Sequence, residues 1–401
     1  MWGLYQLAAE CAHRFGYRYI ETPAFEHTEL FRRTSGESSD VVRKEMYTFE
    51  DRGERSLTLR PEATAAIVRA YLERGRGLPS PFKVFTVETM WRYGRPQSGR
   101  LREFRQFDAE VIDEPGWGAD VETIALGGEL LRTAAVGQVE LQINSIGDGN
   151  CRPAYREELV AYLRAHRQEL RDEHRDRFEE NPLRILDCKD EGCKQVAAGA
   201  PKIVERLCEP CREHFQGVLE GLRAEGIEPV LTDTLVRGLD YYTRTTWEWV
   251  SPRLAKGQDS VGGGGRYDGL AEILGGPPTP GVGFAIGLER VLMLREGGEP
   301  VLNLERPETF VVGIGELSLA HTIARELRRR GVSAEVALEP RPLGTQLKMA
   351  DRSNARYAVI VGSREAQAGT LTLRDLESGD QEELEFDQVV LRIATRRGTQ
   401  E

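Results

Sequence analysis

Hydrophobic and polar positions from the start of the chain to about residue 110 predict two helices, a strand and two hairpins. Apolar residues recur at helical spacing from Leu4 to Phe15, and Gly16 follows as a helix terminator. Alternating residues then predict strands, because successive side chains of a strand point to opposite faces. The expected elements are a helix over 2–15, a strand over 17–23, a hairpin of 44–50 with 56–60, and an apolar helix over 61–72.

The second and longer hairpin is expected where five arginines fall within fourteen positions, from Arg92 to Arg105. Residues 83–87 alternate before it, and its tip at 95–100 contains the Pro and Gly of a turn. At a period of two, one face of the returning strand carries Phe104, Gln106, Asp108 and Glu110. Neighbouring guanidiniums repel one another unless an anion holds them, and their forked donors suit phosphate oxygens. The hairpin is therefore either a phosphate-binding element or a solvated basic edge strand.

The middle of the chain predicts further elements around a charged insertion. We expect a helix over 119–134, a strand over 140–145, a strand in the second half of 235–250, and a strand passing into a helix over 280–295. The insertion spans about 150–230, and within it 156–178 has a helical apolar stripe. The glycine run at 262–265 matches neither a P-loop nor a dinucleotide fingerprint. It predicts either a flexible turn between strands or a backbone that a ligand approaches closely.

The residues after about 300 predict a second domain. Gly297, Gly298 and Pro300 indicate a linker over 297–307. Strands and helices then alternate as βαβαβ over 309–361, and two more strands and a closing helix from Asp387 follow, which is typical of a small α/β domain of parallel type. Because 401 residues exceed one ordinary hydrophobic core, we expect one domain over 1–300 and another over 307–401.

Composition narrows the class of protein. The sequence contains no run of about 18 apolar residues and no signal-peptide pattern at its start, so we expect a cytoplasmic protein without a membrane span. A net charge of −11 argues against avid non-specific binding of nucleic acid. A local basic face can still recognise a particular RNA on an acidic protein.

Six cysteines without a secretory signal indicate a reducing compartment, where metal ligands or free thiols are more common than disulfides. The insertion carries a C-x4-C…C-x2-C array made of Cys188, Cys193, Cys208 and Cys211. Thiolates at such spacings close a tetrahedral zinc site, although C-x4-C is less typical than C-x2-C. The alternatives are one structural Zn2+ at these four cysteines or four unligated thiols, with Cys11 and Cys151 as packing residues.

Several of these stretches together resemble the histidyl-tRNA synthetases, which are class II aminoacyl-tRNA synthetases. Residues 16–23 resemble motif 1 of that class, 90–113 resemble motif 2, and 281–290 resemble motif 3. The stretch LVRGLDYYTRTTWEWV at 235–250 and GGGGRYDG at 262–269 resemble the two stretches particular to histidine enzymes. The resemblance implies a catalytic domain built on an antiparallel sheet flanked by helices, followed by a small C-terminal α/β anticodon-binding domain.

The family activity implied is a two-step reaction. L-Histidine and ATP, with Mg2+, would give histidyl-adenylate and pyrophosphate, and histidine would then pass to the 3′ end of tRNA(His). The resemblance also implies a homodimer that pairs through motif 1. The alternative within the same fold is the non-charging, synthetase-like regulatory subunit of ATP phosphoribosyltransferase, which lacks the C-terminal domain and usually degrades the RGLDYY stretch.

The resemblance assigns roles to particular side chains. Arg92, Arg237 and Arg290 would be catalytic, and with Arg100 they would bind ATP: Arg92 at the α-phosphate, Arg290 at the γ-phosphate, and Arg237 between the histidine carboxylate and the α-phosphate. Glu62, Thr64 and Gln106 would bind the α-amino group of histidine. Glu110 and Tyr242 would bind the imidazole ring, and Tyr241 and Tyr267 would wall the pocket.

The sequence departs from the family pattern at three places. An Arg-Gly-x-x-Asp stretch that usually precedes the first helix is absent, which bears on the dimer edge and the floor of the site. Gly94 stands where motif 2 commonly has a Glu that contacts adenine, and we expect weaker ATP binding from this change. Ala63 for the more usual Gly is a mild change.

Overall fold

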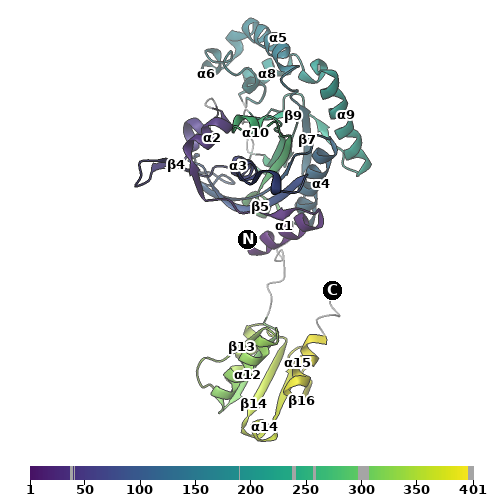
Figure 1. The fold of residues 1–401 in the computed structure, drawn as a ribbon. Coiled ribbons are helices and arrows are strands. Elements are labelled where there is room, and N and C mark those ends of the chain that lie inside the picture. Colours follow the sequence, from purple (N-terminus) through teal and green to yellow (C-terminus); the bar gives the residue numbers. More distant parts are fainter. Residues whose placement is uncertain are drawn as a thin grey trace. The chain divides into compact units, whose positions relative to one another are not determined.

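The computed structural model describes residues 1–36, 39, 41–188, 190–236, 241–255, 259–296 and 307–395. The chain divides into two compact units, Met1–Leu302 and Asn303–Glu401 (Figure 1). Each unit has hydrophobic clusters of its own. Among the described residues, no helix is both long and apolar enough to cross a membrane.

The first unit is built on an eight-stranded sheet. Its strands in spatial order are β1 (Arg18–Tyr19), β5 (Phe82–Trp91), β6 (Glu103–Ile112), β11 (Gly281–Gly287), β10 (Ser260–Arg266), β9 (Thr243–Val250), β7 (Glu140–Ser145) and β8 (Val230–Leu231). Every pairing from β5 to β7 is antiparallel, and only the short edge strands β1 and β8 pair in parallel. The predicted antiparallel sheet and its long hairpin, β5–β6, are confirmed. The strand expected over 17–23 is reduced to the two residues of β1.

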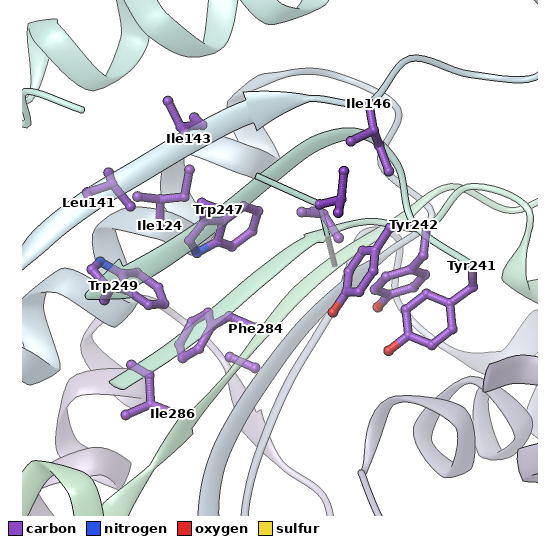
Figure 2. Packing of buried hydrophobic residues seen from close by; sticks show 14 of the residues in the cluster. Ile124, Leu141, Ile143, Ile146, Tyr241, Tyr242, Trp247, Trp249, Phe284 and Ile286 are labelled. Atoms are coloured by element: carbon purple, nitrogen blue, oxygen red, sulfur yellow. The ribbon is translucent and has the colours of Figure 1, made fainter. Parts of the chain in front are cut away.

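Helices cover one face of this sheet because they bury an apolar stripe against it. The helix α1 (Trp2–Arg14) contacts β5 and α4 (Gly118–Thr133), and α4 contacts β11. The contact between α4 and β9 is close, because a Cβ at Gly127 would overlap the ring of Trp249. Figure 2 shows Trp247, Trp249 and Phe284 packed together in this core.

The elements over the opposite face include α3 (Thr64–Arg74) and a three-stranded sheet, whose order is β2 (Phe25–His27), β4 (Ser56–Leu59) and β3 (Thr48–Glu50). The hairpin expected from 44–60 is confirmed in β3 and β4, but its first strand begins later than predicted. The reason is that Val41–Glu45 forms a π-helical turn, which follows α2 (Thr28–Ser35). Arg60 anchors the passage from β4 to α3, because its guanidinium pairs with buried Glu88 of β5.

The insertion between β7 and β8 is helical. It contains α5 (Arg152–Ala165), α6 (Asp172–Arg175), α7 (Leu183–Leu186), α8 (Glu191–Ala198) and α9 (Glu209–Ala224), and α9 packs beside α4 (Figure 1). The prediction of one helix over 156–178 is wrong, since α5 ends at Ala165. Leu170 is 1% exposed and has an extended backbone, so burying it in the core requires the chain to leave the helical path.

The glycine run lies in a central strand, and the expectation of a flexible turn there is wrong. Its residues pair with β9 on one side and with β11 on the other. A Cβ at Gly264 would lie 2.7 Å from the Trp247 ring and would overlap the carbonyl oxygen of Gly283. Glycine is therefore needed because neighbouring strands and rings already fill the space that a side chain would take.

A buried ion pair holds the end of this strand. The guanidinium of Arg266 lies 2.5 Å from Asp120 of α4, and both side chains have no solvent exposure. Asp120 also faces the ring of His214 on α9, at 3.3 Å. Although burial opposes it, the charge of Arg266 lowers the pKa of Asp120 below its usual range. The pair connects β10, the helical layer and the insertion.

The second unit is a five-stranded sheet with helices. Its elements are β12 (Thr309–Ile314), α12 (Leu317–Arg329), β13 (Ala334–Val336), α13 (Leu343–Arg352), β14 (Tyr357–Gly362), α14 (Ser363–Ala368), β15 (Thr370–Asp375), β16 (Gln381–Glu385) and α15 (Phe386–Thr395). The spatial order is β13-β12-β14-β15-β16, parallel among the first three strands and antiparallel after them. The predicted βαβαβ portion is confirmed, and α14 was not predicted. Most of the expected linker at 297–307 lies outside the described residues.

Candidate active site

A cavity of about 380 Å³ opens in the first unit beside the β5–β6 hairpin, the start of α3, the glycine strand β10 and the helix α11 (Leu288–Leu294). Its lining includes carboxylates, arginines, two tyrosines and bare glycine backbone. Of the site residues predicted from the sequence, those that line it are Glu62, Thr64, Arg92, Arg100, Gln106, Tyr241, Tyr242 and Arg290. Arg237 lies outside the described residues.

Three buried carboxyl groups lie close to one another: Glu62 and Asp108 line the cavity, whereas Glu110, like Tyr267, is not among its lining residues. Glu62 precedes α3, and Asp108 and Glu110 share one face of β6 because they are two residues apart in a strand. Burial raises the pKa of Glu62 and of Asp108, and for Asp108 the neighbouring Glu110 and Glu62 raise it further. Burial also raises the pKa of Glu110, to about 8. The ionised forms of these carboxyl groups would be stabilised by a cation or by hydrogen-bond donors.

Glu110 is held by two hydroxyl groups. Thr64 Oγ1 donates to its Oε1 at 2.6 Å, and the hydroxyl of Tyr267 donates to its Oε2 at 2.5 Å. Backbone encloses the same carboxyl group, because a Cβ at Gly283 would overlap Glu110 Oε2. Tyr267 is fixed in turn by Gly281, where a Cβ would overlap its ring. The position of Glu110 is thus determined before any ligand binds.

Two side-chain oxygens on β6 are free to accept hydrogen bonds from a ligand. Gln106 Oε1 and Asp108 Oδ2 are buried and have no hydrogen-bond partner among the described residues. Buried polar atoms are normally paired, so an unpaired set at a cavity indicates a place for a ligand's donors. Both residues line the cavity.

Three tyrosines form the wall beside these carboxyl groups. The ring centroids of Tyr241 and Tyr242 are 4.6 Å apart, and those of Tyr241 and Tyr267 are 5.9 Å apart. Figure 2 shows the hydroxyl groups of Tyr241 and Tyr242 directed to the same side. Aromatic rings that carry hydroxyl groups suit a ligand ring that carries hydrogen-bonding atoms.

Three arginines also line the cavity. Arg92 Nε donates to Pro61 O at 2.8 Å, with its guanidinium 5.4 Å from the ring centroid of Phe104. Arg290 Nε donates to Gly99 O at 3.0 Å, which joins the start of α11 to the tip of the hairpin. Burial and the charges of Arg92 and Arg100 lower the pKa of Arg290. Arg100 pairs with Glu45. Arginines that repel one another in a cavity are stabilised by an anion.

The structure adds acidic residues that sequence reasoning did not assign. Glu45, Glu248, Asp259 and Glu289 also line the cavity. Glu248 lies between buried Trp247 and Trp249, and this alternation is a signal that could have found it. Glu45 belongs to a π-helical turn, for which the sequence has no periodic signal.

The cysteines of the insertion form two groups, so the prediction of one site made of Cys188, Cys193, Cys208 and Cys211 is wrong. Cys188 and Cys193 lie with His174, whereas Cys208 and Cys211 lie with Asp148 and Cys151. The second pair of cysteines starts α9 and therefore faces the turn after β7. Cys151, which was expected to be a packing residue, is a member of that group. Cys11 is buried in the core, as expected for a packing residue.

The mainly antiparallel sheet, its arginine-bearing hairpin and the cavity lined by arginines and buried carboxyl groups define a class II aminoacyl-tRNA synthetase. A family model described as histidyl-tRNA synthetase matches residues 4–291, and one described as anticodon binding domain matches residues 308–396. The chain belongs to the histidyl-tRNA synthetase family.

Relatives resemble the chain over almost its whole length. It is 45% identical over 389 residues to the histidine–tRNA ligase of Acetivibrio thermocellus, which covers 96% of this chain and 93% of the relative. It is 47% identical over 394 residues to that of Moorella thermoacetica, covering 96% and 91%. The crystal structure of apo histidyl-tRNA synthetase from S. aureus matches with a TM-score of 0.79 and 32% identity, covering 97% of this chain and 94% of that one.

Proposed function

We propose that the chain activates L-histidine with ATP to give histidyl-adenylate and pyrophosphate, and then transfers histidine to the 3′ end of tRNA(His). The observation that carries this proposal is one cavity that holds the buried carboxyl groups of Glu62 and Asp108 together with the guanidiniums of Arg92, Arg100 and Arg290. The cationic amino group of an amino acid is complementary to the carboxyl groups, and a polyphosphate is complementary to the arginines. The family to which the chain belongs supports the same reaction.

Activation of histidine requires stabilisation of negative charge rather than a general base. The carboxylate of histidine is ionised at neutral pH, so it attacks the α-phosphorus of ATP without a general base. The reaction brings an anionic nucleophile, phosphoryl oxygens and departing pyrophosphate into one site, where fixed cations stabilise the developing charge. Arg92 would hold the α-phosphate and Arg290 the γ-phosphate, with Arg100 on the hairpin loop. Arg237 would join the carboxylate to the α-phosphate.

Recognition of histidine requires partners for its amino group and for both ring nitrogens. Glu62, Thr64 and Gln106 would receive the α-ammonium group, and the unpaired Gln106 Oε1 supports this assignment. Glu110 and Tyr242 would bind the imidazole, and the rings of Tyr241 and Tyr267 would wall the pocket. An analogue without a ring N–H would leave buried polar groups unpaired, which a site of this kind strongly disfavours.

Magnesium would accompany the nucleotide. Glu248 and Asp259 line the cavity near Arg290, where their charges act on its guanidinium. Carboxylate oxygens are the protein ligands that Mg2+ prefers, so the donor set fits the ion. Bound there, Mg2+ would neutralise charge on the β- and γ-phosphates.

Adenine recognition differs from the usual family pattern. Gly94 is buried, and a Cβ at this position would lie 2.8 Å from Arg100 Nε. A glutamate could therefore not occupy this position while Arg100 keeps its place beside Glu45. We infer that Arg100 fills the space that a glutamate side chain would take in relatives with the usual motif 2.

Each of the two units suggests a macromolecular partner. The second unit would bind the anticodon of tRNA(His), in keeping with its family model. Two chains would pair through residues 16–23, where Tyr19 of the edge strand β1 is 53% exposed. Light scattering of the purified chain should then give twice the 45.0 kDa chain mass. A mass of one chain at micromolar concentration would contradict the dimer.

Histidine-dependent exchange of pyrophosphate into ATP tests the proposed activation step. We expect exchange with histidine and Mg2+ but with no other amino acid. Loss of one charge-stabilising donor should reduce the rate about 100-fold or more in Arg237→Ala and in Arg290→Ala. Arg132→Ala, which removes an exposed arginine paired with Glu129, is the matched control and should leave the rate unchanged. A folded protein without histidine-dependent exchange would overturn the proposal.

A further inference from the structure

Four possible metal ligands meet where the insertion leaves the catalytic sheet. Asp148 and Cys151 lie on the turn between β7 and α5, and Cys208 and Cys211 lie at the start of α9. One ligand atom from each of the four lies within 4.8 Å of the others. Cys11 excepted, all cysteines of the chain belong to this group or to the His174 group.

The distances within the group are those of ligands around one small cation. Cys151 Sγ is 3.9 Å from Cys211 Sγ, and Asp148 Oδ1 is 3.5 Å from Cys151 Sγ and 3.7 Å from Cys208 Sγ. A tetrahedral zinc with bonds of about 2.3 Å to sulfur and about 2.0 Å to oxygen separates two sulfurs by about 3.8 Å, and a sulfur from an oxygen by about 3.5 Å. The Sγ–Sγ distance is also far from the roughly 2 Å of a disulfide.

The backbone around the group is shaped to hold it. Gly147 has a φ of +64°, and a Cβ there would lie 2.5 Å from Cys151 Sγ, so only glycine lets the turn wrap the sulfur. The backbone N–H of Asp148 donates to Cys151 Sγ at 3.2 Å, and that of Asn150 donates to Asp148 Oδ1 at 2.9 Å. Donors of this kind orient metal ligands and stabilise their negative charge.

Two helices also begin at the group. Cys151 is the N-cap of α5 and Cys208 the N-cap of α9, and these helices have 14 and 16 residues. The positive ends of both helix dipoles therefore lie beside the sulfurs, where they stabilise negative charge. Bound as thiolates, the three cysteines together with one carboxylate would carry a net negative charge that a divalent cation compensates.

We propose that Asp148, Cys151, Cys208 and Cys211 bind a structural Zn2+ ion. The ligand set, three sulfurs and one oxygen, fills all four tetrahedral positions and leaves none for substrate. The site fastens the insertion to the turn after β7. The next residue, Arg152, donates to Ile146 O and to Tyr242 O. Through Arg152, the ion therefore also helps to position Tyr242 of the histidine pocket.

The group of His174, Cys188 and Cys193 provides an internal control. It offers three ligands rather than four among the described residues, and Cys193 Sγ lies 3.6 Å from His174 Nδ1. A variant of this group tests whether the first group binds metal independently. Its sulfurs lie in the same insertion, so the two variants carry matched Cys→Ser changes.

The test is the zinc content of the full chain after purification, measured by plasma mass spectrometry and independent of catalytic activity. We expect at least one zinc per chain, one equivalent less in Cys151→Ser/Cys211→Ser, and one equivalent retained in Cys188→Ser/Cys193→Ser. X-ray absorption of that last variant should show three sulfurs and one oxygen around zinc. Co2+ in its place should give the sulfur-to-metal charge-transfer bands and intense d–d bands of a tetrahedral thiolate site.

Two results would overturn the proposal. One is a wild-type chain that contains no zinc and takes up none from a zinc-buffered solution. The other is an undiminished zinc content in Cys151→Ser/Cys211→Ser. Because the first of these and the absorption spectrum need no change to this ligand group, the proposal stays testable even if Cys151→Ser/Cys211→Ser fails to fold.

Discussion

Among the residues of the site, Glu110 has the pKa shift that gives the clearest experimental test. Burial raises its pKa to about 8, above the ordinary value of 4.5. The folded chain therefore holds a proton that the unfolded chain releases between these values. The stability linked to Glu110 is present below the lower value and is lost as pH rises through the upper one, by about 1.4 kcal/mol for each pH unit between them.

We therefore expect Glu110→Gln to flatten the pH dependence of the free energy of unfolding between about pH 5 and about pH 8. Urea unfolding at several pH values measures it. Glu140→Gln, at an exposed position of β7, is the control and should keep the wild-type slope. An unchanged slope in Glu110→Gln would show that other groups carry the dependence.

The same ionisation should control the binding of histidine. The two hydroxyl donors on Glu110 leave its ionised form free to accept a ring N–H, so kcat/KM for histidine should rise as pH rises through about 8. In Glu110→Gln the value should be lower and this rise should vanish. The pyrophosphate-exchange rate at limiting histidine measures it. A rise that persists in Glu110→Gln would assign it to another group.

Residue patterns predicted much of this site, and their limits are physical. A period of two along β6 indicated that Gln106 and Glu110 share a face, because strand geometry alone decides it. Which face meets which partner depends on the pairing of distant strands, so the contact of Glu110 with Tyr267 could not be predicted. The grouping of Cys151 with Cys211 was missed for the same reason, since sixty residues separate them in the chain.

At the scale of elements, the pairing of β11 with β6 leaves no room for a side chain at Gly283. A Cβ there would overlap Glu110 Oε2 and lie 2.7 Å from Ala109 O. We expect Gly283→Ala to destabilise the chain by about 1–3 kcal/mol and to raise KM for histidine at least about tenfold, because the carboxyl group must move. Exchange kinetics and urea unfolding measure the two effects.

A matched glycine provides the control for that variant. Gly128 lies within α4 with nothing within 4 Å of the position of its Cβ. Gly128→Ala should stabilise the helix by up to about 1 kcal/mol and leave KM unchanged. If Gly283→Ala behaves like Gly128→Ala, the close approach of β11 to Glu110 is not rigid.

Breaking the buried ion pair at the end of β10 should greatly lower the stability of the fold. Arg266→Met removes one partner of the fully buried Arg266–Asp120 pair and leaves a buried carboxylate, which costs about 3–5 kcal/mol. Arg253→Met removes an exposed partner of Glu296 and should cost less than about 1 kcal/mol. Urea midpoints compare the two variants. Equal losses would mean that the buried pair has no special role.

Elements with strong periodicity were predicted well, such as α4 and the β5–β6 hairpin, since amphipathic spacing is a local signal. The glycine strand β10 was not, because glycines have no apolar pattern and their place in a sheet is decided by neighbours such as Trp247. The helix α5 ends early for a tertiary reason, the burial of Leu170. Local pattern therefore failed where packing at a distance decides the backbone.

At the scale of the molecule, the two units have separate cores and should separate functionally. We expect a chain of residues 1–302 to keep histidine-dependent exchange, because the described cavity residues all lie within it. Its rate of tRNA charging should fall about 100-fold or more, because a second binding module raises effective concentration by that order. Exchange and charging assays on the same preparation measure both. Loss of exchange would mean that the second unit supports the cavity.

The glycine-rich wall of the cavity also limits how this molecule can change over evolutionary time. At Gly262 and Gly283 the main chain itself lines the cavity, so there is no side chain to shorten, and a Cβ there would overlap atoms of the neighbouring strands. Single substitutions can therefore neither enlarge nor narrow the pocket along this wall. A descendant with a different amino-acid preference would have to arise where side chains line the described pocket, such as the start of α3, β6 and the tyrosine wall.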